Sequence, residues 1–306
     1  MKTVSVIIPN YNYGRFLREA IDSVLGQTHP PHEVIVIDDG STDESRQILE
    51  SYGSRVRVHF QKNEGVGAAR NKGAEMASGE ILAFLDADDY WSPLKLEKQL
   101  AELEAKPDVG LVHCGLQYVD GKGGLGDAYL VGYAGDVAEN LLRFEPVISG
   151  PGGTSMIPRS VFLEVGGYDI NKDLHPSEDW ELSYRIATRY KFAFVPEPLL
   201  FYRQHGGGGH TNIPRMERAM LLAYGKAFAE DDEKVQRIRK ECYGNFYMVL
   251  AGSYLHSGNI VKSVSSGIRS LVYQPAKVTR LLGFPFRVAK RILRPGSGKT
   301  DRSHSF

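Results

Sequence analysis

The sequence has little cysteine, no excess of charge and no long apolar run. Its two cysteines, Cys114 and Cys242, form no CxxC pair and no zinc pattern, so we expect packed thiols in a reducing compartment. The 37 basic and 37 acidic residues cancel, which disfavours binding of nucleic acid through bulk electrostatics. The first apolar run, residues 4–8, ends at Pro9, too soon for a signal peptide. No run of about 18 apolar residues requires a membrane span, so we expect a cytoplasmic protein.

Predicted strands and helices alternate through the first hundred residues. The β-branched runs at 4–8 and 34–37 are typical of strands buried on both faces. Between them, apolar residues recur at helical spacing over 14–26, and the alternation continues to residue 105. Strands separated by helices of this length predict βαβ units. We therefore expect an α/β fold with a Rossmann-like, mostly parallel sheet flanked by helices.

The second half of the chain has a different pattern. We expect a helix over 178–190 and two short strands at 192–195 and 199–202, separated by Pro196 and Pro198. Four consecutive glycines follow at 206–209, and the pattern beyond them is helical, including an uncharged stretch at 242–261 that we interpret as a core helix. The sequence therefore predicts a first domain at 1–212 and a helical C-terminal region at 213–306.

Acidic residues follow two of the predicted strands. Asp38 and Asp39 come after the second strand, and Asp86 and Asp88 come after the fourth. Each pair alone is also typical of a turn or a helix cap. In a parallel sheet, however, these strand ends meet at the edge where ligands bind. Crowded carboxylates raise one another's pKa unless a cation lies between them, and oxygen ligands favour Mg²⁺ or Mn²⁺. With Arg70 nearby, such a site suits a pyrophosphate.

Seven segments in order resemble the successive motifs of family 2 glycosyltransferases. They are VSVIIPNYN (4–12), EVIVIDDGSTD (33–43), NEGVGAARN (63–71), LDADD (85–89), GGYD (166–169), EDWEL (178–182) and YRQH (202–205). The resemblance covers about two thirds of the chain. It implies a glycosyltransferase A-type fold, a nucleotide-sugar donor, a divalent metal and inversion at the anomeric carbon.

The resemblance also implies roles for residues of the donor pocket. Asp39 would accept the imide N–H of a uracil-type base, which favours a UDP-sugar, and Pro9 and Tyr11 would line the base pocket. Asp38 would support the same loop. Arg70 would lie near the nucleotide.

Further matched positions imply roles in metal binding and catalysis. Asp86 would approach the ribose and the metal, and Asp88 would be the main metal ligand. Asp179 would be the catalytic base. His205 would complete the metal shell, as a histidine does in some relatives, or it would be a histidine on a flexible loop without that role. Trp180 is either a platform for a sugar ring or a core residue.

Basic and apolar residues alternate in the acid-free segment 273–294. Such a segment either lies on an anionic membrane surface or forms a solvated helix packed on the first domain. The first alternative would place the protein on the inner face of the plasma membrane and suits a lipid-linked acceptor.

We therefore expect 1–212 to be a nucleotide-sugar-binding catalytic domain. The function expected is inverting, metal-dependent sugar transfer to a hydroxyl of a glycan or lipid-linked glycan, in cell-surface polysaccharide biosynthesis. One alternative is a nucleotidyltransferase that makes a nucleotide-sugar. Another is a non-catalytic membrane-docking protein with a degenerate site, against which Asp86, Asp88 and Asp179 argue.

Overall fold

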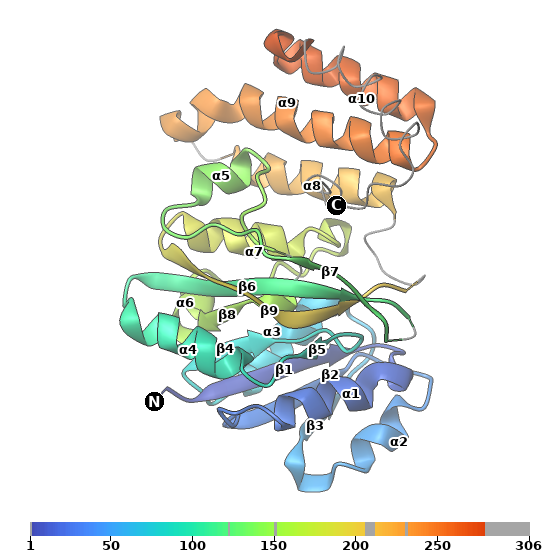
Figure 1. Ribbon diagram of the computed structural model, residues 1–306, viewed down its shortest axis with the longest axis vertical. Coiled ribbons are helices and arrows are strands. Elements are labelled where there is room, and N and C mark those ends of the chain that lie inside the picture. The colour runs from blue at the N-terminus through green and yellow to red at the C-terminus, as the bar shows by residue number, and fades with distance from the viewer. Residues whose placement is uncertain (1, 122, 150–151, 206–211, 230–231, 279–306) are drawn as a thin grey trace. The chain divides into compact units, whose positions relative to one another are not determined.

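The computed structural model describes residues 2–121, 123–149, 152–205, 212–229 and 232–278 (Figure 1). The chain forms two compact units. The first comprises residues 1–141 and 146–208, and the second comprises 142–145 and 209–306. Each unit is described by itself below.

Four parallel strands form the N-terminal half of the first unit. They are β1 (Val4–Asn10), β2 (Glu33–Asp38), β3 (Arg57–Phe60) and β4 (Ile81–Phe84), in the order β3-β2-β1-β4. The connecting segments contain the helices α1 (Gly14–Leu25), α2 (Ser45–Glu50) and α3 (Val66–Met76) and the 3₁₀ turn η1 (Gly53–Arg55). The expected α/β fold is confirmed, and the strand ends carrying the acidic residues meet at one edge.

The remaining strands turn the sheet into a mixed one. They are β5 (Tyr90–Trp91), β6 (Val109–Val119), β7 (Leu125–Tyr129), β8 (Met156–Pro158) and β9 (Lys191–Arg203). Strand β8 runs antiparallel to β4 and β6, whereas β9 runs parallel to β6. The helices of this half are α4 (Lys95–Ala105), α5 (Ala138–Leu142), α6 (Arg159–Glu164) and α7 (Glu178–Ala187), with 3₁₀ turns η2 (Gly152–Thr154) and η3 (Lys172–Leu174).

The two short strands expected at 192–195 and 199–202 form one continuous strand, β9. This prediction was wrong because it took Pro196 and Pro198 as breaks. The register of β9 against β6 shifts between Val195 and Pro198. Proline is tolerated at such an irregularity because no ladder hydrogen bond is required from its missing N–H.

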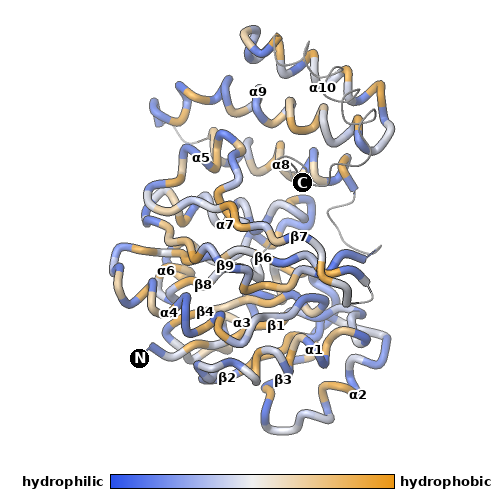
Figure 2. The backbone as a smooth tube through the Cα atoms, in the orientation of Figure 1, coloured by the Kyte–Doolittle hydropathy of each residue, from blue (hydrophilic) through white to orange (hydrophobic). Residues whose placement is uncertain are grey.

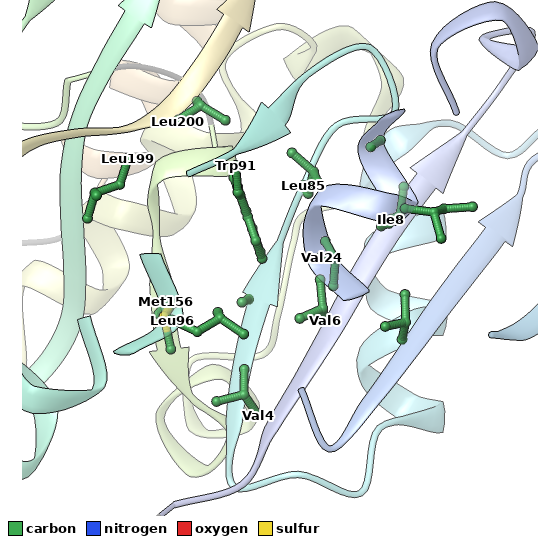
Figure 3. Close-up of a cluster of buried hydrophobic side chains, with 14 of the residues drawn as sticks. Val4, Val6, Ile8, Val24, Leu85, Trp91, Leu96, Met156, Leu199 and Leu200 are labelled. Atoms are coloured by element: carbon green, nitrogen blue, oxygen red, sulfur yellow. The ribbon is translucent and has the colours of Figure 1, made fainter. Parts of the chain in front are cut away.

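The main core of the first unit lies against the sheet. Alternate residues of β1 (Val4, Val6 and Ile8) are fully buried, and Figure 3 shows them with Val24 of α1 and Leu96 of α4. Burying each side chain of this size stabilises the fold by about 1.5–3 kcal/mol. The core therefore fixes the strand ends that carry the polar residues.

The second unit consists mainly of α8 (Ile213–Ala227), α9 (Glu233–His256) and α10 (Ile260–Tyr273), followed by the 3₁₀ turn η5 (Pro275–Lys277). The single core helix expected over 242–261 is divided between α9 and α10, because the chain turns at Gly258, whose φ is 78°. Within the described residues, no helix has the length and apolarity needed to cross a membrane. Of the basic segment 273–294, residues 279–294 lie outside the described part.

Candidate active site

Asp38, at the end of β2, supports the loop that follows it. Its Oδ2 accepts a hydrogen bond from Asn10 Nδ2 (2.8 Å), and its Oδ1 accepts one from the backbone N–H of Ser41 (2.9 Å). The Asp38 side chain is buried. These bonds join the ends of β1 and β2.

Asp39 connects this loop to the N-terminus of α3. Its Oδ1 accepts hydrogen bonds from Gln61 Nε2 (2.8 Å) and the Glu64 backbone N–H (2.9 Å), and its Oδ2 accepts one from the Gly65 N–H (2.8 Å). Gly65 has a φ of 99°, which a residue with a side chain rarely adopts. A carboxylate oxygen has two acceptor sites, so Oδ2 retains one for a further donor.

The two residues expected to line the pocket of the nucleotide base, Pro9 and Tyr11, lie at the end of β1 and directly after it. Pro9 is buried within β1 and aligned with Ile37 of β2, whereas Tyr11 is 47% exposed. The next residue, Asn12, has a φ of 58° and donates its backbone N–H to Ser41 Oγ (2.9 Å). The backbone after β1 is thus held against the loop that follows β2, and the exposed Tyr11 is part of this segment.

Arg70, in the first two turns of α3, lies between two carboxylates. It donates from Nη2 to Asp86 Oδ1 (2.7 Å) and from Nη1 to Asp179 Oδ1 (3.0 Å). Its guanidinium lies 5.0 Å from the centroid of the Tyr168 ring. Only 3% of the Arg70 side chain is exposed. Burial opposes its charge, but Asp179 and Asp86 raise the Arg70 pKa well above its ordinary value.

Asp179 is mounted in the first turn of α7. Its Oδ1 accepts from Arg70 and from the Tyr168 hydroxyl (3.0 Å), and a quarter of the side chain is exposed. Gly152 lies against it so closely that a Cβ there would be 2.6 Å from Oδ1. Burial raises the pKa of Asp179, while the Arg70 charge opposes this and Glu178 adds to it.

The pKa of the neighbouring Glu178 is shifted in the opposite direction. Burial disfavours its charge, but a hydrogen bond with His175 Nδ1 (3.0 Å) and the charge of Arg70 lower its pKa below the ordinary value. Adjacent carboxylates whose pKa values are shifted apart are suited to different tasks. Glu178 therefore remains ionised, and Asp179 is the stronger base of the two.

Asp86 and Asp88 lie close together after β4. Burial raises the pKa of Asp88, and the charge of Asp86 raises it further. Asp88 Oδ2 is 2.8 Å from His205 Nε2, whose ring packs edge-on to Tyr13 with centroids 5.7 Å apart. The structure thus pairs Asp88 with His205, whereas Asp86 is paired with Arg70 (Nη2 to Oδ1, 2.7 Å).

The donor set fits a divalent cation held jointly with a ligand. Asp86 and Asp88 supply carboxylate oxygens, the ligands that a hard cation prefers, and a cation between them would relieve their mutual repulsion. In the described part of the chain, no three His, Cys, Asp or Glu side chains are gathered closely enough to hold an ion by themselves. An ion here would therefore need further oxygen atoms, which a bound diphosphate offers.

Sequence reasoning assigned no role to Tyr168, Gly152 or Arg203. Arg203 donates from Nε to the Asp88 carbonyl (3.0 Å), and its guanidinium lies 4.7 Å from the centroid of the Phe16 ring. Tyr168 and Arg203 belong to the GGYD and YRQH motifs, so their position in those motifs was the available signal. Gly152 belongs to no motif that we identified.

Trp180 follows Asp179 on α7 and is half-buried. Its ring stacks on Tyr184, with centroids 5.7 Å apart and planes inclined by 8°. This stacking is compatible with a core residue and with a platform whose outer face meets a sugar.

Comparison with known sequences shows one family. The family model described as "Glycosyl transferase family 2" matches residues 5–166. An uncharacterized glycosyltransferase of Nostoc (alr2836) is 37% identical over 217 residues, which are 68% of this chain and 67% of that protein. The putative teichuronic acid biosynthesis glycosyltransferase TuaG of Bacillus subtilis is 48% identical over 101 residues, 32% of this chain and 40% of TuaG. The chain thus spans about two thirds or less of the length of these relatives.

Solved structures show the same fold at lower identity. S. aureus TarS in complex with UDP-GlcNAc gives a TM-score of 0.62 at 17% identity, covering 87% of this chain and 90% of that chain. The mannosyltransferase PcManGT from Pyrobaculum calidifontis, in complex with GDP-Man and Mn²⁺, gives a TM-score of 0.62 at 20% identity. This match covers 96% of this chain and 81% of that chain. Both likenesses establish the fold alone.

Proposed function

Because the chain belongs to family 2 of the glycosyl transferases, we propose that it is an inverting, metal-dependent transferase. It moves a sugar from a UDP-sugar to a hydroxyl of a glycan or lipid-linked glycan acceptor, in cell-surface polysaccharide biosynthesis. The observation that carries the proposal is the placement of Asp179. A partly exposed carboxylate of raised pKa is linked through Arg70 to Asp86, beside the Asp88–His205 pair.

In this proposal Asp179 removes the proton of the acceptor hydroxyl. The acceptor oxygen attacks the anomeric carbon while the bond from that carbon to the nucleoside diphosphate breaks, so the configuration inverts in one step. One base suffices because no covalent sugar intermediate forms. Arg70 and Tyr168 hold Oδ1, and this leaves Oδ2 to receive the proton.

The proposed donor site combines the strand ends. Asp39 would accept the imide N–H of uracil at the free acceptor site of Oδ2, with Tyr11 as one wall. Asp86, Asp88 and His205 would hold Mg²⁺ or Mn²⁺ together with the diphosphate. When bound, the cation would neutralise the charge that develops on the departing diphosphate. The PcManGT complex contains Mn²⁺, which supports metal dependence without choosing the metal.

The acceptor is proposed from two observations. TuaG is named for the biosynthesis of teichuronic acid, a cell-surface polysaccharide. The acid-free basic segment 273–294 suits an anionic membrane surface, and binding there would bring the enzyme to a lipid-linked acceptor. This proposal places the protein at the inner face of the plasma membrane and requires no nucleic acid. Family membership favours glycosyl transfer over the nucleotidyl transfer considered above.

Replacing the base tests the proposal. Asp179→Asn keeps the size and the polar contacts of the side chain but removes its basicity. We expect it to lower the rate of nucleoside-diphosphate release from a UDP-sugar, in the presence of acceptor glycans and Mn²⁺, by roughly a hundredfold or more. Donor affinity should change little. Asp173→Asn, an exposed aspartate on η3, is the matched control. Near-full transfer by Asp179→Asn would exclude this residue as the base.

A further inference from the structure

Helix α10 has the reverse of the usual distribution of polar and apolar residues. Its buried residues are small and mostly polar: Ser263, Ser266, Gly267 and Ser270. Five of its large apolar residues lie on the exposed face. They are Ile260, Val261, Val264, Ile268 and Val272, between 55% and 81% exposed. In Figure 2, hydrophobic stretches, drawn in orange, recur along α10. A helix that meets water is expected to bury such residues instead.

The buried face of α10 is well packed on α9. Ser263 Oγ donates to the Ala251 carbonyl (2.8 Å), and Ser270 Oγ donates to the Gly244 carbonyl (2.7 Å). Both hydroxyls are therefore satisfied by the α9 backbone, and the small side chains permit close approach of the two helices. Small residues and Ser hydroxyls between helices, with large apolar residues outside, are the arrangement found in lipid.

The charge of the segment that contains α10 indicates an anionic lipid. Residues 242–300 contain no aspartate or glutamate and nine lysines and arginines. Since the whole chain is neutral, this segment carries a local excess of positive charge. Three of the nine, Lys262, Arg269 and Lys277, belong to α10 and η5, and the other six follow in the sequence outside the described residues. A basic segment joined to an apolar helix face is attracted to an anionic bilayer.

We propose that the exposed face of α10, comprising Ile260, Val261, Val264, Ile268 and Val272, docks into the interface of a bilayer containing anionic phospholipid. The helix lies in the interface and does not span the bilayer. Its 14 residues extend about 21 Å, which is shorter than the hydrocarbon core of about 30 Å. Docking itself does not depend on the transfer reaction. The role of docking, which is to bring the enzyme to a lipid-linked acceptor, rests on the proposed function.

A thiol probe on α10 tests the proposal directly. The native Cys114 and Cys242 are both buried, so Val264→Cys provides one reactive thiol on the proposed face for a polarity-sensitive fluorophore. With vesicles of phosphatidylcholine and 30% phosphatidylglycerol, we expect a blue shift in its emission. Leu163→Cys, whose parent side chain on α6 is 52% exposed, is the control and should show no shift.

The apolar contribution is tested by the triple variant Val261→Asn/Val264→Asn/Ile268→Asn. We expect it to lose vesicle binding by roughly tenfold or more in flotation, since it exposes amides in place of apolar groups. Its thermal unfolding and its release of nucleoside diphosphate from a soluble donor and acceptor should not change. Those two controls separate failure of docking from misfolding and from failure of the proposed function.

Three results would overturn the proposal. Vesicle binding without a shift at position 264 would place the membrane contact elsewhere. A slow reaction of the thiol in water, with elution as a dimer, would mean that a second copy covers the face. A slow reaction in a monomer would mean that another part of the chain covers it.

Discussion

Tyr168 and Arg70 donate to the same oxygen of Asp179. Such hydrogen bonds favour the charged carboxylate and therefore lower its pKa, whereas burial raises it. The net direction is upward, so Asp179 takes up a proton more readily than an aspartate in water. A base is active only without its proton, and the rate should therefore fall as the pH falls through this raised pKa.

Tyr168→Phe is expected to move this acid limb to higher pH. The substitution removes a hydrogen bond that favours the ionised form of Asp179, so the pKa rises further. The measurement is the pH profile of kcat/KM in the variant and the parent. Tyr190→Phe removes a hydroxyl that contacts Glu164 instead and is the control. An acid limb at the same pH in Tyr168→Phe and in the parent would mean that Tyr168 has no influence on the pKa of Asp179.

At the scale of elements, Glu33 joins the start of β2 to its neighbours. Its Oε1 accepts from Ser5 Oγ on β1 (2.7 Å) and from the Ser78 backbone N–H (2.7 Å), and its Oε2 pairs with Arg57 on β3. Although burial opposes the charge, these hydrogen bonds lower the pKa of Glu33 to about 2 from an ordinary 4.5. The ionised glutamate thus holds the sheet in register.

Glu33→Gln should lower the free energy of unfolding at pH 7 by about 3 kcal/mol, since the pKa of Glu33 falls from 4.5 to about 2 on folding. A carboxyl group whose pKa is lower in the folded than in the unfolded protein stabilises the fold at pH values above its unfolded pKa. This stabilisation is lost as the pH falls from the unfolded pKa to the folded pKa. The difference between variant and parent should therefore shrink below pH 4.5 and vanish near pH 2. Denaturant titrations at several pH values check this, with the exposed Glu50→Gln as control. A difference independent of pH would contradict the account.

The sequence predicts elements well where burial is continuous and less well where it is not. The apolar runs of β1 and β2 were found because these strands are buried almost throughout, and the helical spacing of α1 was found because one face of the helix is buried. Strand β9 was predicted as two, since the effect of Pro196 and Pro198 depends on the register against β6, which is a tertiary property. The two-residue strand β5 and the exposed β7 carry too short or too polar a pattern to be recognised.

At the scale of the whole molecule, the predicted site residues converge because the strand order is β3-β2-β1-β4. That order brings Asp39 and Asp86 to one edge, as expected from alternating strands and helices. The contact of Arg70 with Asp179 joins residues 109 positions apart in the chain, so spacing alone could not reveal it. Likewise, helical periodicity identifies α10 as a helix but does not tell which of its faces is packed.

The central claim is that this edge binds a nucleotide-sugar together with a divalent cation. The most direct measurement is the melting temperature of the protein with a panel of nucleoside diphosphates and nucleotide-sugars, each with and without Mn²⁺, repeated on Asp88→Asn. A ligand at a hundred times its Kd should raise the melting temperature of the wild type by roughly 5 °C. We expect this rise for UDP species only with Mn²⁺, and we expect Asp88→Asn to lose it. No rise with any nucleotide at millimolar concentration would contradict the central claim.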